Sequence, residues 1–427
     1  ASAVFALCGH LGAQVEHANQ LAAVVWLPLL LLLADLSSGR VGLSEGPSDA
    51  GFRTRLAGSM SLALVIAVQL LVGHSQSSYI ALAGMLVYCL HFPVRAIACS
   101  LRQREDRAIK LRSAGRLLLT SLAPVVLAVL LGFALAAIQL LPTWELSRQS
   151  IRSGGLAYRE AASFSVKPRM LLYTLFPIFF ENLGQAHGTE AFTEYVSYVG
   201  VLGLAIAAYG ARSAKRRVRA RQMMALASVG LFLAIGIYNP AYYVLFRFVP
   251  GFDLFRAPAR WMLLYSFGLA MLVGFGIEHL GSRSIGWRAA LERLRRRSTI
   301  VVSAAAISTL LLVLALIWLR KPGIPTVLGW LAAITVALLS ICGTAALGRG
   351  KRLAKVAALV LICAELLLAS RVLPHATPTT IDAVTSARTA ASHLRSDTEL
   401  HRFLSLSDTS FDPGDLAETR SLYSGFL

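Results

Sequence analysis

Uncharged apolar stretches long enough to cross a membrane recur along this sequence, and they limit its fold more than any other feature. Residues 117–141 read LLLTSLAPVVLAVLLGFALAAIQLL, and residues 298–319 read STIVVSAAAISTLLLVLALIWL. A helix needs about 20 mainly apolar residues to cross the ~30 Å hydrocarbon core of a bilayer. Only 15% of the 427 residues are charged, against roughly 25% in an average soluble domain. The sequence therefore predicts an all-α polytopic membrane protein.

The positive charge between the apolar stretches predicts their orientation. The linkers 37–55, 95–116, 211–221, 281–297 and 348–355 together hold 26 Lys and Arg residues, whereas the alternate linkers hold 10. Loops rich in Lys and Arg stay in the cytoplasm, so the first set is predicted to be cytoplasmic. These cytoplasmic linkers account for the net charge of +19, so nucleic acid is not expected as a partner.

Ten complete spans and one partial span satisfy this alternation of charge. The partial span lies at about 1–11, and the complete spans lie near 20–36, 56–73, 77–94, 117–141, 194–210, 222–238, 260–280, 299–319, 326–347 and 354–372. The sequence thus predicts a multi-pass domain over residues 1–372 in the plasma membrane. Since the chain begins inside an apolar segment, a further segment is expected upstream of Ala1.

Two regions outside the spans are predicted to lie on the outer face. The long loop 142–193 contains MLLYTLFPIFF at 170–180. This stretch is too short to cross the bilayer as a helix, and a proline interrupts it, so it is predicted to be re-entrant or interfacial. Residues 373–427 are polar and are predicted to form a small extracytoplasmic C-terminal region. At this length the region is marginal as an independent domain, and it is expected to be the start of a larger one.

The polar residues that could carry chemistry concentrate on the predicted outer face. The sequence contains no P-loop, GxSxG or HExxH motif, and its five cysteines have no metal-binding or disulfide spacing. The outer-face candidates are the acids Glu16, Glu145 and Glu194, together with His17, Asn19, His74, Gln76, Arg148, Glu181, Asn182, His187 and Tyr195. Each residue alone is explained by helix capping, a salt bridge or the interfacial aromatic belt. Their concentration on one face favours a functional site there.

Two arginines lie four residues apart at the predicted outer entrance of the span 260–280. Pro258, between Arg256 and Arg260, is typical of the first turn of a helix. Cations are disfavoured at a helix N-terminus, whereas a bound anion is favoured. The pair therefore predicts a negative partner, which is either Asp253 in an internal salt bridge or the phosphate of a ligand. We expect the phosphate, with Arg260 deeper and more important than Arg256.

Several segments of the chain resemble the bacterial YfhO-type membrane proteins. The segments are HANQLAAVVWLPLLLLL, GHSQ, AIQLLPTWELSRQS, FPIFFEN, EYVSYVGVLGL and VPGFDLFRAPARWMLLYSFGLAMLVGFGIEHL, in the same order over most of residues 5–281. That family is similar to the GT-C glycosyltransferases, multi-span enzymes that take a sugar from a polyprenyl-phosphate carrier at the outer leaflet. The resemblance implies a GT-C-like bundle, here of about 10–11 transmembrane helices.

The resemblance also implies an activity and its partners. A sugar would pass from a polyprenyl-phosphate donor to a cell-envelope acceptor, such as a teichoic-acid-type polymer, another glycan or a protein. Arg256 and Arg260 would bind the donor phosphate, and Glu16, Glu145 or Glu194 would bind the acceptor or assist proton transfer. GT-C enzymes usually carry an essential acid in their first outer loop, so the main acid is expected upstream of residue 1. A divalent metal ion could share the work on the phosphate, but no ligand set in the sequence demands one.

Two other classes of function also fit the sequence. A transporter or flippase of an envelope lipid or polymer would place charges inside spans and broken helices in two matching halves. Glu365 is the clearest acid within a late span, and we find no inverted repeat. A non-catalytic membrane scaffold would show neither these features nor an outer cavity.

Overall fold

The regular structure of the protein is helical wherever the chain is described. The computed structural model describes residues 1–15, 17–39, 51–102, 107–150, 153–179, 183, 192–211, 217–280, 322–346 and 351–373, and every regular element in these ranges is a helix. Helices satisfy their own backbone hydrogen bonds, which the interior of a bilayer requires. The chain divides into two units, residues 1–372 and 373–427. The predicted extracytoplasmic region lies outside the described residues, apart from Leu373.

The helices range from single turns to 29 residues. The longer ones are α4 (Leu27–Ser37), α5 (Phe52–Leu71), α6 (Ser75–Arg102), α7 (Arg107–Leu135), α8 (Ala137–Arg148), α12 (Val201–Gly210), α13 (Arg217–Ala234), α14 (Pro240–Phe248), α15 (Met262–His279), α18 (Ile324–Ala346) and α19 (Lys351–Ser370). The shorter ones are α1 (Ser2–Ala6), α2 (Gly9–Ala13), α3 (Ala18–Val24), α9 (Tyr158–Ala161), α10 (Leu171–Leu175) and the 3-10 turns η1 (Pro168–Met170), η2 (Phe192–Glu194), η3 (Gly236–Tyr238) and η4 (Pro258–Trp261).

Several of these helices are long and apolar enough to cross a membrane. By length and composition the candidates are Ala18–Ser37, Phe52–Leu71, Ser75–Arg95 and Pro258–His279, with a fifth if Ser121–Leu135 and Ala137–Arg148, bent by 74° relative to each other, form one span. They correspond to the predicted spans 20–36, 56–73, 77–94, 260–280 and 117–141. This set of helices is that of an α-helical membrane protein.

The other predicted spans have mixed outcomes. The segments predicted at 222–238, 326–347 and 354–372 overlap α13, α18 and α19, each of which begins a few residues earlier than predicted, and the predicted partial span at 1–11 overlaps α1 and α2. The segment 299–319 lies outside the described residues. The prediction for 194–210 is wrong in its first part, because α12 begins only at Val201 and has ten residues. Such a helix is about 15 Å long, which is half of the ~30 Å hydrocarbon core.

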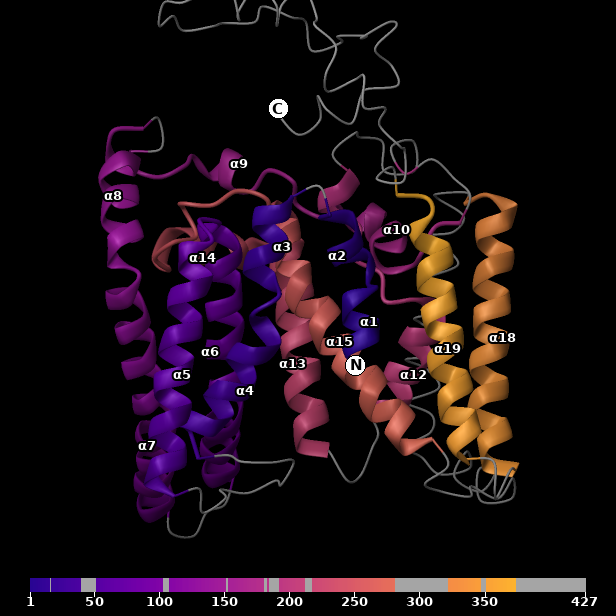
Figure 1. The fold of residues 1–427 in the computed structure, drawn as a ribbon, viewed down its shortest axis with the longest axis horizontal. Helices are drawn as coiled ribbons and strands as arrows, with labels where there is room; N and C mark the ends of the chain where they lie inside the picture. The colour runs from indigo at the N-terminus through magenta and orange to yellow at the C-terminus, as the bar shows by residue number, and fades with distance from the viewer. Residues whose placement is uncertain are drawn as a thin grey trace, which may run out of the picture. The chain divides into compact units, whose positions relative to one another are not determined.

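The helix α15 forms the centre of the packing. It is the most buried of the candidate spans, with 72% of its apolar window buried, and it packs against α12 and α13 (Figure 1). Glycines permit a close approach to α12, because a Cβ atom on Gly276 would collide with the backbone carbonyl of Ile206. A Cβ atom on Gly210 would likewise collide with the carbonyl of Leu272. Small residues at such contacts are typical of helix pairs in membranes.

An exposed apolar stripe on α5 indicates a surface that faces lipid. Leu56, Met60, Leu64 and Val68 follow one another at intervals of four residues, and their side chains are 38–60% exposed. Residues four apart lie on the same face of a helix. A continuous exposed apolar face is unfavourable in water but favourable against lipid chains, so this side of α5 fits the hydrocarbon of the bilayer.

The predicted outer loop 142–193 begins within a helix. The helix α8 continues to Arg148, because Pro142 lies inside it without ending it. The stretch 170–180 contains only the short helix α10, which does not cross the bilayer. It packs against α18, where the Thr326 hydroxyl donates to the Phe179 carbonyl at 3.0 Å and the Trp330 indole donates to the Pro177 carbonyl at 2.7 Å.

The predicted orientation has a direct test. In a background without native cysteines, a cysteine at Ser153 is expected to react with a membrane-impermeant maleimide in intact cells. A cysteine at Arg352, in a predicted cytoplasmic linker, should react only after the membrane is permeabilised. Both positions are exposed, so access to the reagent depends on the side of the membrane. Labelling of the Arg352 position in intact cells would overturn the orientation.

Candidate functional site

Aromatic side chains hold the segment before α15 against the first turns of α6. The rings of Phe252 and Trp261 stack with their centroids 5.6 Å apart, and the edge of Tyr79 contacts Phe252 at 6.0 Å. The Tyr79 hydroxyl donates to the carbonyl oxygen of Pro250 at 2.9 Å. Aromatic rings bury large apolar areas and prefer such stacked and edge contacts. The arginines of this segment are therefore fixed relative to α6.

Gln76 joins both arginines to α6. It lies one turn before Tyr79 on the same side of the helix, and its side chain is buried. Its Nε2 donates to the backbone carbonyl of Arg256, and its Oε1 accepts a hydrogen bond of 2.7 Å from Nη1 of Arg260. The amide group thus uses one donor and one acceptor to fix the backbone of one arginine and the side chain of the other.

The negative partner of Arg260 is Glu194. Nε of Arg260 donates to Oε2 of Glu194 at 2.9 Å, and Nη2 donates to Oε1 at 2.5 Å, so the contact is bidentate. The side chains of Arg260 and Glu194 are only 16% and 9% exposed. Asp253, the alternative partner expected from the sequence, instead lies against Gly155, and its backbone carbonyl accepts from the N–H of Leu156 at 2.8 Å.

A polar cavity of about 240 Å³ opens beside this pair. It is lined by Gly73, His74, Ser75, Gln76, Phe255, Arg256 and Arg260. Arg256 is exposed, and within the described part of the chain no carboxylate pairs with it; its guanidinium carbon lies 5.9 Å from the centre of the Phe164 ring. Arg260 is the deeper of the two, as expected. However, most of its donors are already engaged by Glu194 and Gln76, so Arg256 is the more open of the two to a ligand.

His74 presents a neutral imidazole to this cavity. Its Nδ1 accepts the backbone N–H of Ser77 at 3.2 Å, so the proton of the neutral ring lies on Nε2. Burial, followed by the positive charge of Arg260, lowers the pKa of His74 to about 4, although Glu194 acts in the opposite direction. At neutral pH the ring is therefore a hydrogen-bond donor without a charge. Together with the two arginines it makes a cavity suited to an anion.

The low pKa of His74 predicts a pH dependence of stability. An unfolded chain binds a proton at this histidine below pH 6.5, whereas the folded protein does so only near pH 4. Its contribution to stability should therefore be lost as the pH falls from about 6.5 to about 4. We expect the thermal midpoint of the purified protein to fall over this range, and the fall to be smaller in His74→Gln. An unchanged pH profile in His74→Gln would contradict this assignment.

Other residues predicted for the site lie elsewhere or play local roles. Glu145 and Arg148 are exposed on α8, where the guanidinium carbon of Arg148 lies 4.9 Å from the centre of the Trp144 ring. His17 occupies the N-cap position of α3. The side chain of Asn19 accepts the N–H of Gln20 at 2.8 Å, which is a local contact at the start of that helix.

Of the remaining candidates, Tyr195 is buried directly after Glu194. Glu16, Glu181, Asn182 and His187 lie outside the described residues. The site assembled by the structure therefore consists of Arg256, Arg260, His74, Gln76 and Glu194, which were all predicted as candidates.

The described residues do not favour a divalent metal ion at this site. No group of three or more His, Cys, Asp or Glu side chains in the described ranges could hold a metal ion. The polar cavity is lined by two guanidinium groups and an imidazole N–H, which repel or cannot ligate a cation, since divalent ions need oxygen or unprotonated nitrogen ligands.

One buried polar cluster was missed in the sequence. Nη1 of Arg219 lies 2.9 Å from Oδ2 of Asp35, and the Tyr88 hydroxyl donates to the same oxygen at 2.7 Å. Arg219 lies in the linker 211–221, and its charge was attributed to the predicted orientation in the membrane rather than to a buried partner. Asp35 is the only acid in the first predicted span, 20–36, and an acid in such a place signals a buried partner.

A second acid inside a predicted span has a structural partner. Glu365 of α19 accepts the N–H of Val201 at 2.6 Å and the N–H of Leu202 at 3.1 Å. These N–H groups begin the short helix α12 and have no acceptor within that helix. The carboxylate therefore caps a helix that starts where a continuous span was predicted.

No protein-family model matches the chain, and no curated protein or solved structure matches it significantly. The arguments that follow therefore begin from the geometry of the polar cavity.

Proposed function

We propose that the protein is a membrane glycosyltransferase that transfers a sugar from a polyprenyl-phosphate donor to a cell-envelope acceptor. The observation that carries this proposal is the polar cavity, in which Arg256 offers N–H donors and positive charge and His74 offers a further N–H donor. A phosphodiester offers only acceptor oxygens and negative charge, and the guanidinium fork suits it. The resemblance to the YfhO-type proteins supports the same reading.

The cavity suggests how its residues would act on the donor. Its volume of 240 Å³ is below the ~300–1,000 Å³ of pockets for whole drug-sized ligands, so it suits a phosphate group and part of a sugar. During transfer the acceptor oxygen bonds to the sugar carbon, the bond from that carbon to the phosphate oxygen breaks, and negative charge grows on the phosphate. Arg256 would bind that charge directly, and His74 would donate one hydrogen bond.

The proton of the acceptor hydroxyl needs a separate carboxylate. Glu194 accepts two hydrogen bonds from Arg260, and we assign it to positioning Arg260 rather than to proton transfer. Glu145 lies exposed on α8. The base is therefore sought at Glu16.

Removal of the exposed arginine tests the proposal. In the full-length protein, Arg256→Gln is expected to lower the rate of sugar transfer by about 100-fold or more, the scale for losing one preorganised transition-state contact. Arg256→Lys should recover only part, because an ammonium group cannot make two parallel hydrogen bonds. The measurement is transfer of radiolabelled sugar from a polyprenyl-phosphate donor to envelope acceptor in isolated membranes.

The matched control is Arg247→Gln, which removes an exposed arginine from α14. It should leave the transfer rate unchanged, and all variants should keep the wild-type melting temperature. Full transfer by Arg256→Gln would remove the polar cavity as the donor site.

The short helix α12 begins inside the span predicted at 194–210. This interruption favours a second candidate function, a flippase of an envelope lipid. Transporters often carry discontinuous helices and acids within the membrane, and α12 with Glu365 has this form. Proteoliposomes with a fluorescent lipid-linked sugar separate the two candidates. A transferase leaves the dye on its original leaflet, whereas a flippase moves it, and Glu365→Gln would then reduce that movement.

A further inference from the structure

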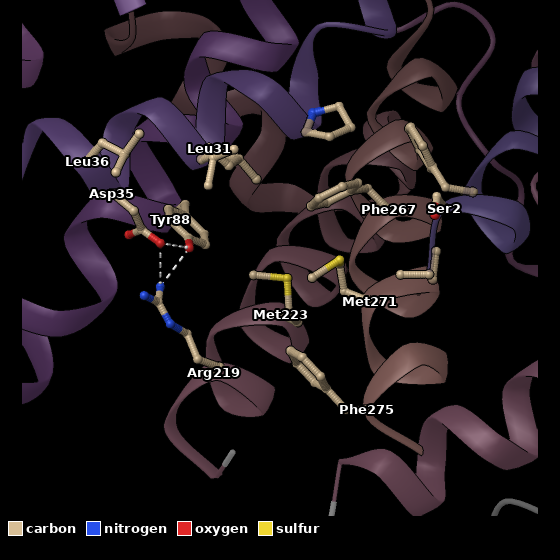
Figure 2. Close-up of a pocket in the computed structure, with 15 residues that line it drawn as sticks. Ser2, Leu31, Asp35, Leu36, Tyr88, Arg219, Met223, Phe267, Met271 and Phe275 are labelled. Carbon is tan, nitrogen blue, oxygen red and sulfur yellow. Dashed lines mark hydrogen bonds and ion pairs between the residues drawn. The ribbon is translucent and has the colours of Figure 1, made fainter. Parts of the chain in front are cut away.

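A second cavity lies apart from the polar cavity, between helices α1, α4, α6, α13 and α15. Its volume is about 490 Å³, which is within the ~300–1,000 Å³ range of ligand pockets. Its walls are mainly apolar, and Phe267, Met223 and Met271 project into it (Figure 2). Methionine and phenylalanine side chains make a surface that adapts to apolar ligands of irregular shape. None of these residues has a role in the function proposed above.

Apart from Ser2, which lies at the opposite end, the polar side chains of the cavity gather at one end (Figure 2). There Asp35, Tyr88 and Arg219 form the buried polar cluster described above (Figure 2). Within the described part of the chain, all the hydrogen bonds of Arg219 run through Nη1. The N–H groups on its Nε and Nη2 can therefore donate to an acceptor oxygen. The cavity combines an apolar body with a hydrogen-bonding end, which is the pattern of an amphiphile.

The position of the cavity indicates a ligand that comes from the membrane. Leu32 lines it and is 56% exposed on the candidate span Ala18–Ser37, so the mouth opens on an apolar helix surface. Along α15 the lining extends from Phe267 to Phe275, which is about 12 Å of helix. This depth is less than half of the ~30 Å hydrocarbon core, so the cavity fits within one leaflet.

We infer that this cavity binds one acyl chain of a bilayer glycerophospholipid. The chain lies among the phenylalanine and methionine side chains, and an oxygen of the glycerol ester or phosphate accepts from Arg219. Asp35 balances the charge of Arg219, so the site does not require an anionic headgroup. The site is distinct from the polar cavity and does not depend on the proposed transferase activity.

A photoactivatable phosphatidylcholine with a diazirine in the middle of one chain tests this site. The protein is reconstituted in liposomes, illuminated and digested, and the labelled peptides are identified by mass spectrometry. Labelling should concentrate on the peptides that contain Leu32 and Met271. Ala270 lines the cavity and is 1% exposed, so the indole of Ala270→Trp would occupy the cavity. This variant should lower that labelling at least fivefold.

The control is Leu64→Trp on the exposed stripe of α5, which should leave the labelling unchanged. If Ala270→Trp does not fold, Met271→Phe fills the cavity more gently and should lower the labelling about twofold. Equal labelling of all exposed helix faces, unchanged in the filled variants, would overturn the proposal. Loss of labelling upon addition of polyprenyl phosphate would also overturn it, since the site would then belong to the carrier.

Discussion

Replacing Glu194 or Arg260 with alanine is expected to lower the free energy of unfolding by about 3–5 kcal/mol, because either change leaves a buried charge without its partner. The two side chains are 9% and 16% exposed and share a bidentate contact. If Arg260 only bound the donor phosphate, its loss would abolish transfer and leave stability near normal. The geometry predicts instead that this variant loses stability together with activity.

A double-mutant cycle separates the pair from its surroundings. Unfolding of the four proteins in detergent should show that Glu194→Ala and Arg260→Ala together cost clearly less than their sum. Arg260→Lys should retain part of the stability, since an ammonium group keeps the charge but loses the fork. Arg256→Ala is the control on the same segment and should change stability by no more than about 0.5 kcal/mol. Additive costs in the cycle would show that the two residues act independently.

Placing one methyl group between α12 and α15 is expected to have a similarly large effect. In Gly276→Ala and Gly210→Ala the new Cβ atom would collide with a backbone carbonyl of the opposing helix. A backbone atom cannot rotate away as a side chain can, so the helices must separate. Such overpacking costs typically 1–3 kcal/mol and occasionally more. We expect each variant to fall at the upper end of this range.

Gly203→Ala supplies the matched control within α12. The nearest atom to its added Cβ would be a methyl carbon of Val273 at 3.9 Å, which is an ordinary contact. Alanine is also the better helix former by about 1 kcal/mol, so this variant should be neutral or slightly stabilised. Thermal unfolding in one detergent compares the three variants directly. Equal effects at residues 203, 210 and 276 would refute the close approach of the two helices.

The sequence was most informative where local signals sufficed. Pro258 predicted the start of a helix, and the spans predicted at 56–73 and 77–94 left only three residues for the turn between them; the structure has η4 from Pro258 and a turn between α5 and α6. Because the ends of neighbouring spans share one face of the membrane, the alternation of spans grouped His74, Gln76 and the arginines. The structure brings these residues to one cavity.

The sequence was least informative where distant segments meet. Glu194 is 66 residues before Arg260, and no local pattern indicates that they pair. Residues 195–200, YVSYVG, are apolar enough to continue a helix, so the break before Val201 is not visible in hydropathy. The break depends on tertiary partners: the N–H of Gly9 donates to the Tyr198 carbonyl at 2.8 Å, and Glu365 caps the helix that follows.

The cap on α12 also constrains how the protein is assembled during its synthesis. Glu365 is made 164 residues after Val201, so the ribosome completes α12, α13 and α15 before the acceptor for the first N–H groups of α12 exists. The release of this ten-residue helix into lipid is unfavourable while its first N–H groups lack acceptors, because each unsatisfied group costs several kcal/mol there. The first N–H groups of α12 therefore need another acceptor, such as water, until α19 has been made.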